Sequence, residues 1–458
     1  MVAVAFLWET MLNPQYGIVN TWLSEPIAFL SQAKGEILGV QVPVALLTVI
    51  AFEAWRYFPF AFLFILARLQ ALPAELDEAA VVDGATPTQR FRYVIMPQLW
   101  RIIALLSVLR FVFTFTKFDD VYLLTGGGAG TEVVSVRVYN FLTSRDDIGA
   151  SAAQAIVLAV FLVVLLAIYL RFFAGVNVSR DRFERGLLKV LKPLVVAFLF
   201  LITAFPFCYM VMLSVRDIQE LILDPGSLWP RSLTLDTYVD VLTRQGFLTF
   251  LKNSTIVAVA SVAVTLLISI PGAYAVARLR FFGRRQVHFL FLAVYLFPAI
   301  VLAIPLFVLF TMIGLRGSLI GLILVYIAQT VPVTVYMLRN YFETVPQSVE
   351  EAAAIDGCTR LSTIWRVVLP LSKPALMATG LYAFMIAWNE FLFALLFLVE
   401  RRENWTVSLG LSQLAGSIEI PTTVLMAGSV VLTLPIVIVF FAGERLLTAG
   451  LTAGAEKG

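Results

Sequence analysis

Seven side chains on two apolar stretches have the types and spacing to hold a polar solute or to pair with one another. At helical spacing, the first stretch carries Glu53, Arg56, Tyr57 and Phe60, and the second carries Arg110, Thr114 and Lys117. A charge at the centre of a membrane span costs about 2.5 to 3.5 kcal/mol, so such residues usually face a cavity or a partner. Two interpretations stay open: a site for a polar solute, and structural ion pairs or side chains that reach the membrane interface.

Catalytic and metal-binding chemistry is not indicated by the residue types present. The chain has a single histidine, His288, and two cysteines, Cys208 and Cys358, which lie far apart without the spacing of metal ligands. The stretch TGGGAGT, residues 125–131, lacks the Gly-Lys-Ser/Thr ending of a phosphate-binding loop. We therefore expect no catalytic residue, no metal site and no cofactor, and we interpret the chain as a transporter rather than an enzyme.

The composition places these side chains in a membrane. Hydrophobic residues make up 60% of the 458 residues and charged residues only 14%, and the mean hydropathy is +0.91. That balance leaves too little polar surface for a soluble protein of this length. The apolar stretches reach the roughly 20 residues that an α-helix needs to cross the hydrocarbon core. The predicted fold class is all-α, a polytopic transmembrane helical bundle, with the lipid bilayer as a partner and no nucleic acid.

Nine apolar stretches are candidate spans, whereas the opening residues 1–9 are apolar but too short to cross. The candidates are residues 41–70, 98–118, 152–173, 190–214, 251–277, 287–311, 317–341, 372–396 and 424–444. A basic stretch from Arg171 to Lys192 follows the third span, and a basic turn from Arg278 to Arg285 lies two crossings later. The positive-inside rule places both in the cytoplasm.

One polar stretch of the chain occurs twice. EAAVVDGATPTQRFRYVIMP covers Glu78–Pro97 and EAAAIDGCTRLSTIWRVVLP covers Glu351–Pro370, at an ungapped offset of 273 residues. The same offset pairs Pro59 with Pro332, so the repeat includes the preceding helix. Counting crossings puts both copies on the cytoplasmic face. Two repeats in the same orientation imply two similar bundles related by an axis along the membrane normal, with the pathway between them.

Each copy of the motif is predicted to form a short surface helix. Pro73 or Pro346 suits the first helical turn, the Glu-Ala-Ala face is compact, and Asp-Gly then ends the helix or turns the chain. A recurring exposed helix of this kind can dock into another protein.

The motif resembles the cytoplasmic signature of the membrane subunits of ATP-binding-cassette (ABC) importers, and its surroundings resemble the carbohydrate-uptake branch, of the maltose and glycerol-phosphate kind. One subunit type has stretches similar to NPQYGIVNTWL, RYFPFAFLFILARLQALP and KFDDVYLLTGGG, which lie in the first half. The other type has stretches similar to WNEFLFALLFL and GLTAGAEKG, which lie in the second half. The resemblance implies two permease subunits fused in one chain.

The resemblance also implies a domain organisation. Residues 1–175 are similar to a first permease half that lacks its first spans, residues 176–189 to a cytoplasmic linker, and residues 190–458 to a second half with six spans. If the start lies too far downstream, the reading frame upstream of Met1 is expected to encode further apolar spans.

In the resembling family, the signature helix fits a cleft in an ATPase subunit. The resemblance therefore implies two copies of a separate ATPase, an extracytoplasmic solute-binding protein, a carbohydrate substrate, and a location in the bacterial or archaeal inner membrane. The coupling residues carried over from the family motif are Glu78, Ala79, Ala80, Asp83, Gly84, Glu351, Ala352, Ala353, Asp356 and Gly357.

The two polar stripes, one from Glu53 to Phe60 and the other from Arg110 to Lys117, differ between the halves. The offset of 273 converts the stripe of Arg110, Thr114 and Lys117 into Ala383, Ala387 and Glu390. This asymmetry favours a sugar site held mainly by the first half, in which Tyr57 and Thr114 contact the substrate. Lys117 and Glu390 are expected to form a gate pair near the pseudo-twofold axis. An ABC permease for another small solute and a secondary transporter remain the alternatives.

Overall fold

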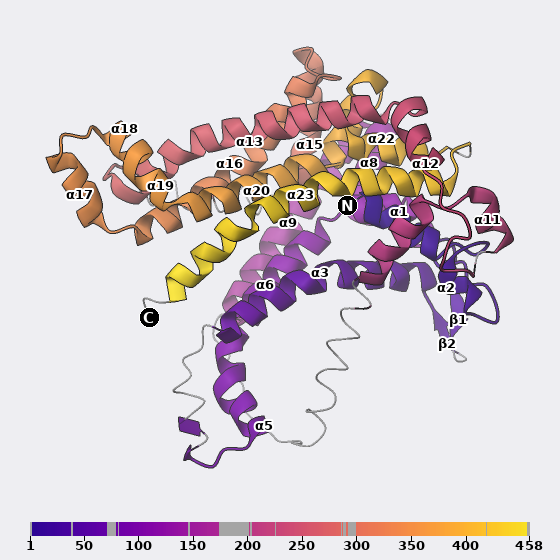
Figure 1. The fold of residues 1–458 in the computed structure, drawn as a ribbon, viewed down its shortest axis with the longest axis horizontal. Helices are drawn as coiled ribbons and strands as arrows, with labels where there is room; N and C mark the ends of the chain where they lie inside the picture. The colour runs from indigo at the N-terminus through magenta and orange to yellow at the C-terminus, as the bar shows by residue number, and fades with distance from the viewer. Residues whose placement is uncertain are drawn as a thin grey trace. The chain divides into compact units, whose positions relative to one another are not determined.

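A computed structural model describes most of the chain (Figure 1). The described residues are 2–37, 40–70, 79–80, 82–144, 147–173, 201, 204–224, 226–284, 286, 290–291, 299–417 and 419–455. They are mostly helical and contain only two short strands, so the predicted all-α class is confirmed. The described residues also contain one small sheet that the sequence did not predict, an antiparallel hairpin of β1 (Gly35–Ile37) and β2 (Val40–Val42) with Glu36 opposite Gln41.

The chain forms two compact units. The amino-terminal unit comprises residues 7–213 and 219–231, and the carboxy-terminal unit comprises residues 1–6, 214–218 and 232–458. The expected linker, residues 176–189, lies outside the described residues. The helix Ala204–Ser214, which the sequence assigns to the second half, lies up to residue 213 in the amino-terminal unit.

The amino-terminal unit holds the second half of α1, all of the elements from α2 to α9, and α11 except its first residue. Its elements are α1 (Val2–Met11), α2 (Ile18–Thr21), β1, β2, α3 (Val44–Gln70), α5 (Pro87–Gln89), the π-helix η1 (Arg90–Ile95), α6 (Met96–Phe115), α7 (Asp119–Thr125), α8 (Val134–Thr143), α9 (Ile148–Phe173) and α11 (Ile218–Leu223).

The carboxy-terminal unit holds the remaining helices. They are α12 (Asp236–Val239), the π-helix η2 (Asp240–Arg244), α13 (Phe247–Arg278), α15 (Ala299–Met312), α16 (Leu319–Thr344), α17 (Gln347–Ile355), α18 (Arg360–Thr363), the π-helix η3 (Ile364–Val368), α19 (Leu369–Leu371), α20 (Lys373–Asn389), α21 (Leu392–Leu398), the 3-10 helix η4 (Arg402–Asn404), α22 (Val407–Ala415) and α23 (Thr422–Ala455).

Four of the described helices are long and apolar enough to cross a membrane. They are Val44–Phe62 within α3, the whole of α13, the whole of α16, and Thr422–Gly443 within α23. A fifth candidate consists of Arg360–Leu371 and Lys373–Asn389, which meet at Ser372 with a bend of 86°. The predicted span 372–396 therefore begins at this bend, and it ends early because α20 stops at Asn389.

The core of the carboxy-terminal unit lies where α13, α16 and α20 pack side by side (Figure 1). At the end of α13 that carries Arg278, buried apolar side chains from α13, α16 and the segment after α17 form one cluster, which includes Tyr274, Leu338, Phe342 and Val368. Pro271 in α13 and Pro332 in α16 lie inside their helices. Neighbouring helices make such prolines tolerable in membrane proteins.

The amino-terminal unit is organised around α3, which packs against α6 and α7. The stretch NPQYGIVNTWL forms the turn after α1, and its buried Asn20 holds the turn together. The side-chain nitrogen of Asn20 donates to the carbonyl oxygens of Leu12, Asn13 and Ile27, and its side-chain oxygen accepts from the Ile27 amide at 2.7 Å. This network ties the entry of α2 to the chain that leads into β1.

Candidate functional site

The second copy of the repeated motif forms α17, which lies at one end of the carboxy-terminal unit (Figure 1). The helix follows Pro346 and stops at Asp356. Gly357 then adopts a φ of +81°, in the left-handed region that only glycine enters without steric cost. Of the predicted coupling residues, Ala353 is buried, and four are exposed: Glu351, Ala352, Asp356 and Gly357.

The first copy has the same local conformation wherever it is described. Glu78 lies outside the described residues, and Ala79 and Ala80 are helical. The Asp83 amide donates to the Ala79 carbonyl at 3.0 Å, and its counterpart Asp356 donates to Ala352 at 2.9 Å. Gly84 has a φ of +72°, matching its counterpart in the second copy. The predicted Asp-Gly turn is therefore present in both copies.

An apolar residue at one position of the motif is exposed in both copies, and sequence reasoning did not single it out. Val82 is 87% exposed and Ile355 is 86% exposed, and the two lie 273 residues apart. A large exposed aliphatic side chain next to an Asp-Gly turn has no partner within its own short helix. In the sequence, these residues could have been found because an aliphatic residue occurs directly before the Asp-Gly pair in both copies of the repeat. These two side chains are the most prominent apolar contacts that the motif presents.

The chain also continues in the same way after the two Asp-Gly turns. Thr86 and Thr359 cap the next helix, since their side chains accept from the amides of Gln89 and Ser362. Both caps lead into a π-helix, η1 or η3, at matching positions of the repeat. The two halves therefore share this backbone feature as well as their sequence. Such π-helical turns are frequent at functional sites.

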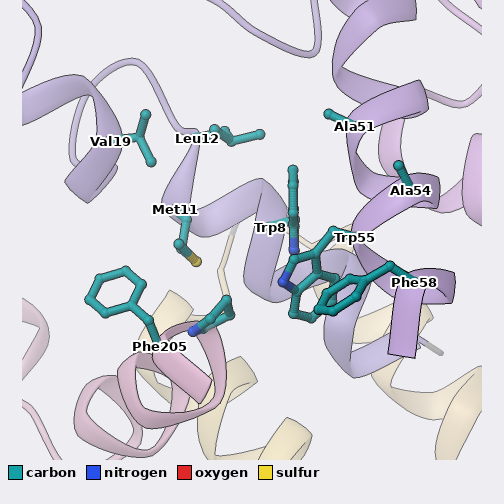
Figure 2. A pocket seen from close by; sticks show the side chains of 10 residues that line it. Trp8, Met11, Leu12, Val19, Ala51, Ala54, Trp55, Phe58 and Phe205 are labelled. Carbon is teal, nitrogen blue, oxygen red and sulfur yellow. The ribbon is translucent and has the colours of Figure 1, made fainter. Parts of the chain in front are cut away.

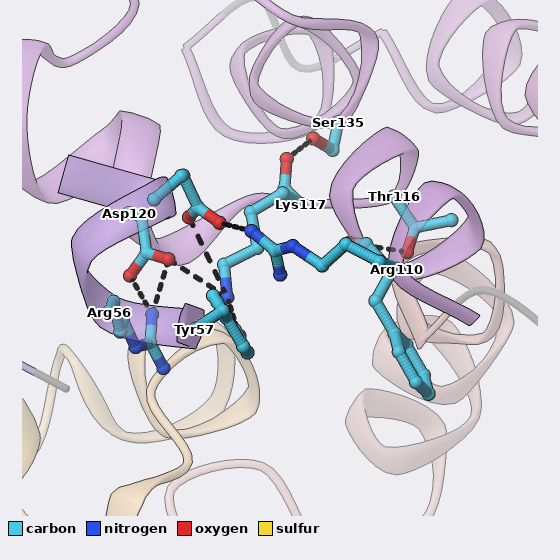
Figure 3. A network of polar contacts seen from close by, with 9 residues as sticks. Arg56, Tyr57, Arg110, Thr116, Lys117, Asp120 and Ser135 are labelled. Carbon is cyan, nitrogen blue, oxygen red and sulfur yellow. Dashed lines mark hydrogen bonds and ion pairs between the residues drawn. The ribbon is translucent and has the colours of Figure 1, made fainter. Parts of the chain in front are cut away.

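A cluster of charges joins α3, α6 and the beginning of α7 (Figure 3). Arg110 donates to the carboxylate of Glu53, and Arg56 donates to that of Asp120. The ammonium nitrogen of Lys117 lies 2.9 Å from Oδ2 of Asp120 and 4.0 Å from Oε1 of Glu53. The charges on the predicted stripes are therefore paired with each other and with Asp120. That carboxylate was missing from the predicted site, although it stands in the stretch KFDDVYLL.

Tyr57 lies at the centre of the cluster (Figure 3). Its phenol oxygen accepts a hydrogen bond from Lys117 at 2.8 Å. The guanidinium carbon of Arg110 lies 3.5 Å from the centre of the Tyr57 ring, a cation–π contact that covers one face of the ring. In this conformation the covered face is closed to a sugar ring.

Two polar atoms of the cluster are buried without a hydrogen bond among the described residues. They are Oε1 of Glu53 and Nη1 of Arg110, one acceptor and one donor. Buried polar atoms normally find partners, so such a pair identifies a place where a further polar group gains hydrogen bonds.

Phe60 and Thr114 lie apart from these contacts. Phe60 is exposed and packs on Phe64 with ring centres 4.5 Å apart. Thr114 is exposed as well, and its carbonyl oxygen accepts from the Lys117 amide at 3.2 Å. The structure thus brings five of the seven predicted stripe residues together, namely Glu53, Arg56, Tyr57, Arg110 and Lys117.

The second half uses the equivalent positions for a smaller polar contact. Tyr326, the counterpart of Glu53, donates to Oε2 of Glu390, the counterpart of Lys117, at 2.8 Å. Oε1 of Glu390 also accepts from the Phe393 amide at 2.8 Å, at the beginning of α21. The same two positions of the repeat therefore interact in both halves. The carboxylate belongs to Glu53 on α3 in the first half and to Glu390, the counterpart of Lys117, in the second. Lys117 and Glu390 each have partners inside their own unit.

An apolar cavity of about 550 Å³ lies elsewhere in the amino-terminal unit (Figure 2). Its lining includes Trp8, Met11, Leu12, Trp55, Phe58 and Phe205. The Trp8 indole nitrogen is buried without a hydrogen bond among the described residues. Sugar hydroxyls need several donors and acceptors, so this lining does not suit a carbohydrate.

The long apolar helices and the internal repeat are those of a polytopic helical membrane protein. The chain belongs to the family described as "Binding-protein-dependent transport system inner membrane component", which matches residues 16–178 and again residues 269–452. It is thus a multi-pass protein of the cell membrane, and the match in two segments agrees with the repeat.

Curated relatives of the chain are permeases. It is 40% identical over 264 residues to the inner membrane ABC transporter permease protein YcjP of Escherichia coli, covering 57% of this chain and 94% of the relative. It is 38% identical over 261 residues to the trehalose/maltose transport system permease protein MalG of Thermococcus litoralis, covering 56% and 93%. A bacterial ABC transporter structure described as importing the acidic polysaccharide alginate has a TM-score of 0.52 at 24% identity and covers 58% of this chain and 99% of its own, which supports the fold.

Proposed function

We propose that this chain is the permease of an ATP-driven importer that moves a carbohydrate, delivered by a binding protein outside the membrane. The relatives named for trehalose and maltose support the carbohydrate. So does the 37% identity over 254 residues to the sulfoquinovosyl glycerol permease SmoH of Agrobacterium fabrum, which covers 56% of this chain and 89% of the relative. The family description, which specifies dependence on a binding protein, supports the delivery step.

ATP hydrolysis in this proposal takes place in a separate ATPase that docks on both motif copies. The observation that carries it is the matched pair of exposed aliphatic residues, Val82 and Ile355, each beside an Asp-Gly turn with the same backbone conformation. Burial of such a side chain against a partner protein stabilises the complex by about 1.5 to 3 kcal/mol, because the side chain is transferred out of water. Two copies of the motif call for two ATPase subunits.

The docking proposal is tested by placing a charge at each position. In Val82→Asp and Ile355→Asp, a carboxylate must enter an apolar pocket, so each site is expected to lose about 2 kcal/mol or more of binding, the range of an interface hot spot. Co-purification of the ATPase with the double variant measures the loss. Ile313→Asp, an exposed residue in the turn before α16, is the matched control. Normal ATPase recovery with the double variant would overturn the docking proposal.

The substrate site in this proposal lies at the charged cluster. Oε1 of Glu53 and Nη1 of Arg110, which make no hydrogen bond among the described residues, support it, because a sugar hydroxyl can accept from the guanidinium and donate to the carboxylate at once. Access requires Arg110 to leave the face of Tyr57, which then becomes free to stack on a sugar ring. Tyr57 and Thr114 remain proposed contacts, with Arg56, Phe60 and Lys117 as further members of the site.

The substrate proposal predicts that alanine at Tyr57 or Thr114 reduces substrate uptake while the ATPase activity that the loaded binding protein stimulates changes less. Thr48→Ala, a buried hydroxyl on α3 that bonds only to the carbonyl of Val44 among the described residues, is the control. Unchanged apparent affinity for the sugar in both variants would place the site elsewhere.

The gate pair of Lys117 and Glu390 also remains a proposal. Each residue is already bound within its own unit, to Asp120 and to Tyr326. A gate between the halves therefore requires the exchange of one polar partner for another during transport. Lys117→Glu and Glu390→Lys are each expected to impair uptake, and the combined exchange is expected to restore part of it. If the single reversals transport normally, there is no such gate.

A secondary transporter is the alternative from another class. It is distinguished by its energy source, because uptake by a secondary transporter collapses when a protonophore or a sodium ionophore removes the driving ion gradient, whereas ATP-driven uptake in proteoliposomes continues. An ABC permease for another small solute is distinguished by testing binding proteins loaded with sugars, amino acids or polyamines.

A further inference from the structure

A polar contact in the carboxy-terminal unit ties α17 to the membrane helix α13, through a residue that lies just before the repeated motif. Oε1 of Glu350 accepts from Nε of Arg278 at 2.7 Å, and Oε2 accepts from the hydroxyl of Tyr274 at 2.8 Å. The side chains of Arg278 and Glu350 are only 10% and 11% exposed. Both carboxylate oxygens of Glu350 thus face α13 rather than the surface on which Ile355 lies exposed.

Arg278 makes a second contact that strengthens the link. Its Nη2 donates to the carbonyl oxygen of Val345 at 2.6 Å. Val345 follows the last residue of α16, Thr344, and lies two residues before α17 begins at Gln347. One guanidinium therefore holds both the turn into α17 and the first turn of α17 itself. Bonds of this charge-assisted kind are stronger than neutral hydrogen bonds and fix the relative geometry of their partners.

The link rests on a rigid base. Tyr274 is one of ten buried residues that form the apolar cluster at this end of α13. Ile364 and Val368, which lie in η3 after the Asp-Gly turn, join the same cluster. The segment from Glu351 to the Asp-Gly turn is therefore anchored on both sides, by an ion pair before it and by apolar packing after it. The exposed segment between the anchors, with Ile355 and Gly357, is free to enter a partner.

A buried contact connects the far part of α13 with the position that matches the charged cluster. The hydroxyls of Thr265 on α13 and Thr330 on α16 lie 2.8 Å apart, and Thr330 is the repeat counterpart of Tyr57. With a rise of about 1.5 Å per residue, Thr265 lies roughly 20 Å along the helix from Arg278. A displacement of α13 at Arg278 that the helix carries along its length, past Pro271, reaches Thr330 through this contact.

We propose that Arg278, Tyr274 and Glu350 form a latch that makes α17 and α13 move as one body, so that a push on α17 reaches the interior of the bundle. The proposal rests on the proposed function of α17 as the ATPase-docking helix. The three are positioning residues: they touch neither substrate nor ATPase, and they convert a docking event into a helix movement.

The test separates coupling from docking. In proteoliposomes with the ATPase and the binding protein, we expect Arg278→Gln, Glu350→Gln and Tyr274→Phe to retain ATPase co-purification and basal ATP hydrolysis. Substrate moved per ATP is expected to fall by roughly twofold to thirtyfold, the range for residues that modulate coupling between sites. The exchange of the two charges, Arg278→Glu with Glu350→Arg, is expected to restore part of the loss.

A neighbouring ion pair supplies the control. Glu343 pairs with Arg339 at 2.8 Å on the same end of α16 and with Arg284 at 3.5 Å. It makes no ion pair or hydrogen bond with Arg278 or Tyr274 among the described residues, and it is more exposed than Glu350. Glu343→Gln is therefore expected to leave the transport-to-ATP ratio unchanged. The latch is overturned if Glu350→Gln and Tyr274→Phe keep the wild-type ratio, or if the charge exchange is no better than the single changes. Failure of the docking proposal is seen separately, as normal ATPase recovery with Ile355→Asp.

Discussion

At the scale of single residues, the charged cluster around Tyr57 shows what a spacing pattern can and cannot predict. Helical periodicity placed Glu53 and Arg56 on one face of α3, and Arg110 and Lys117 on one face of α6 and its end. Periodicity cannot say which two faces meet, because that depends on how the helices pack. The pairing of Arg110 with Glu53 and of Arg56 with Asp120 therefore came from the structure alone.

The pairing leads to a stability prediction for Glu53→Gln. Removing the carboxylate leaves the Arg110 guanidinium without its charged partner at a partly buried position, which we expect to destabilise the protein by about 3 kcal/mol. Arg110→Gln is expected to have a comparable effect, and the double variant less than the sum of the two. Thermal unfolding of the purified variants in detergent measures these changes. Strictly additive effects would show that the two side chains do not interact.

At the scale of helices and turns, the repeat was largely predictable. The ungapped offset located both motifs, and the Asp-Gly pairs predicted turns that the backbone shows at Gly84 and Gly357. The π-helices within the motifs, the bend at Ser372 and the β1–β2 hairpin were not predicted, since each departs locally from the helical pattern that hydropathy indicates. The sequence shows that Val82 and Ile355 are aliphatic and occupy matching positions, but their exposure could be seen only in the folded chain.

The turns give a prediction for Gly84→Val and Gly357→Val. A Cβ at either glycine meets no atom within 4 Å, so the cost is backbone strain at positive φ, about 1 to 2 kcal/mol for an L-residue. We expect the double variant to insert into the membrane but to lose transport, because the motif changes shape. Gly357→Asn is the matched variant, since asparagine tolerates this conformation and should keep more activity. Wild-type uptake by the double valine variant would contradict the proposed coupling role of the turns.

At the scale of the whole molecule, composition and hydropathy were enough to predict a helical membrane protein, and the family match in two segments agrees with the internal repeat. The residue-level evidence for coupling is concentrated in the carboxy-terminal unit, where α17, the latch and the apolar cluster are all described. The evidence for a substrate site is concentrated in the amino-terminal unit, where the charges lie. In the proposed function, both repeats dock the ATPase, and the amino-terminal repeat also holds the substrate site.

The proposed function is tested most directly by measuring whether transport depends on ATP, first with both motif copies intact and then with both disabled. Proteoliposomes holding this chain with its ATPase are supplied with binding protein and radiolabelled sugar, with and without ATP, and uptake is compared for the wild type and for Val82→Asp with Ile355→Asp. The account predicts uptake only with ATP and binding protein, and its loss in the double variant. Uptake that proceeds without ATP, or that the double variant carries out at the wild-type rate, would contradict it.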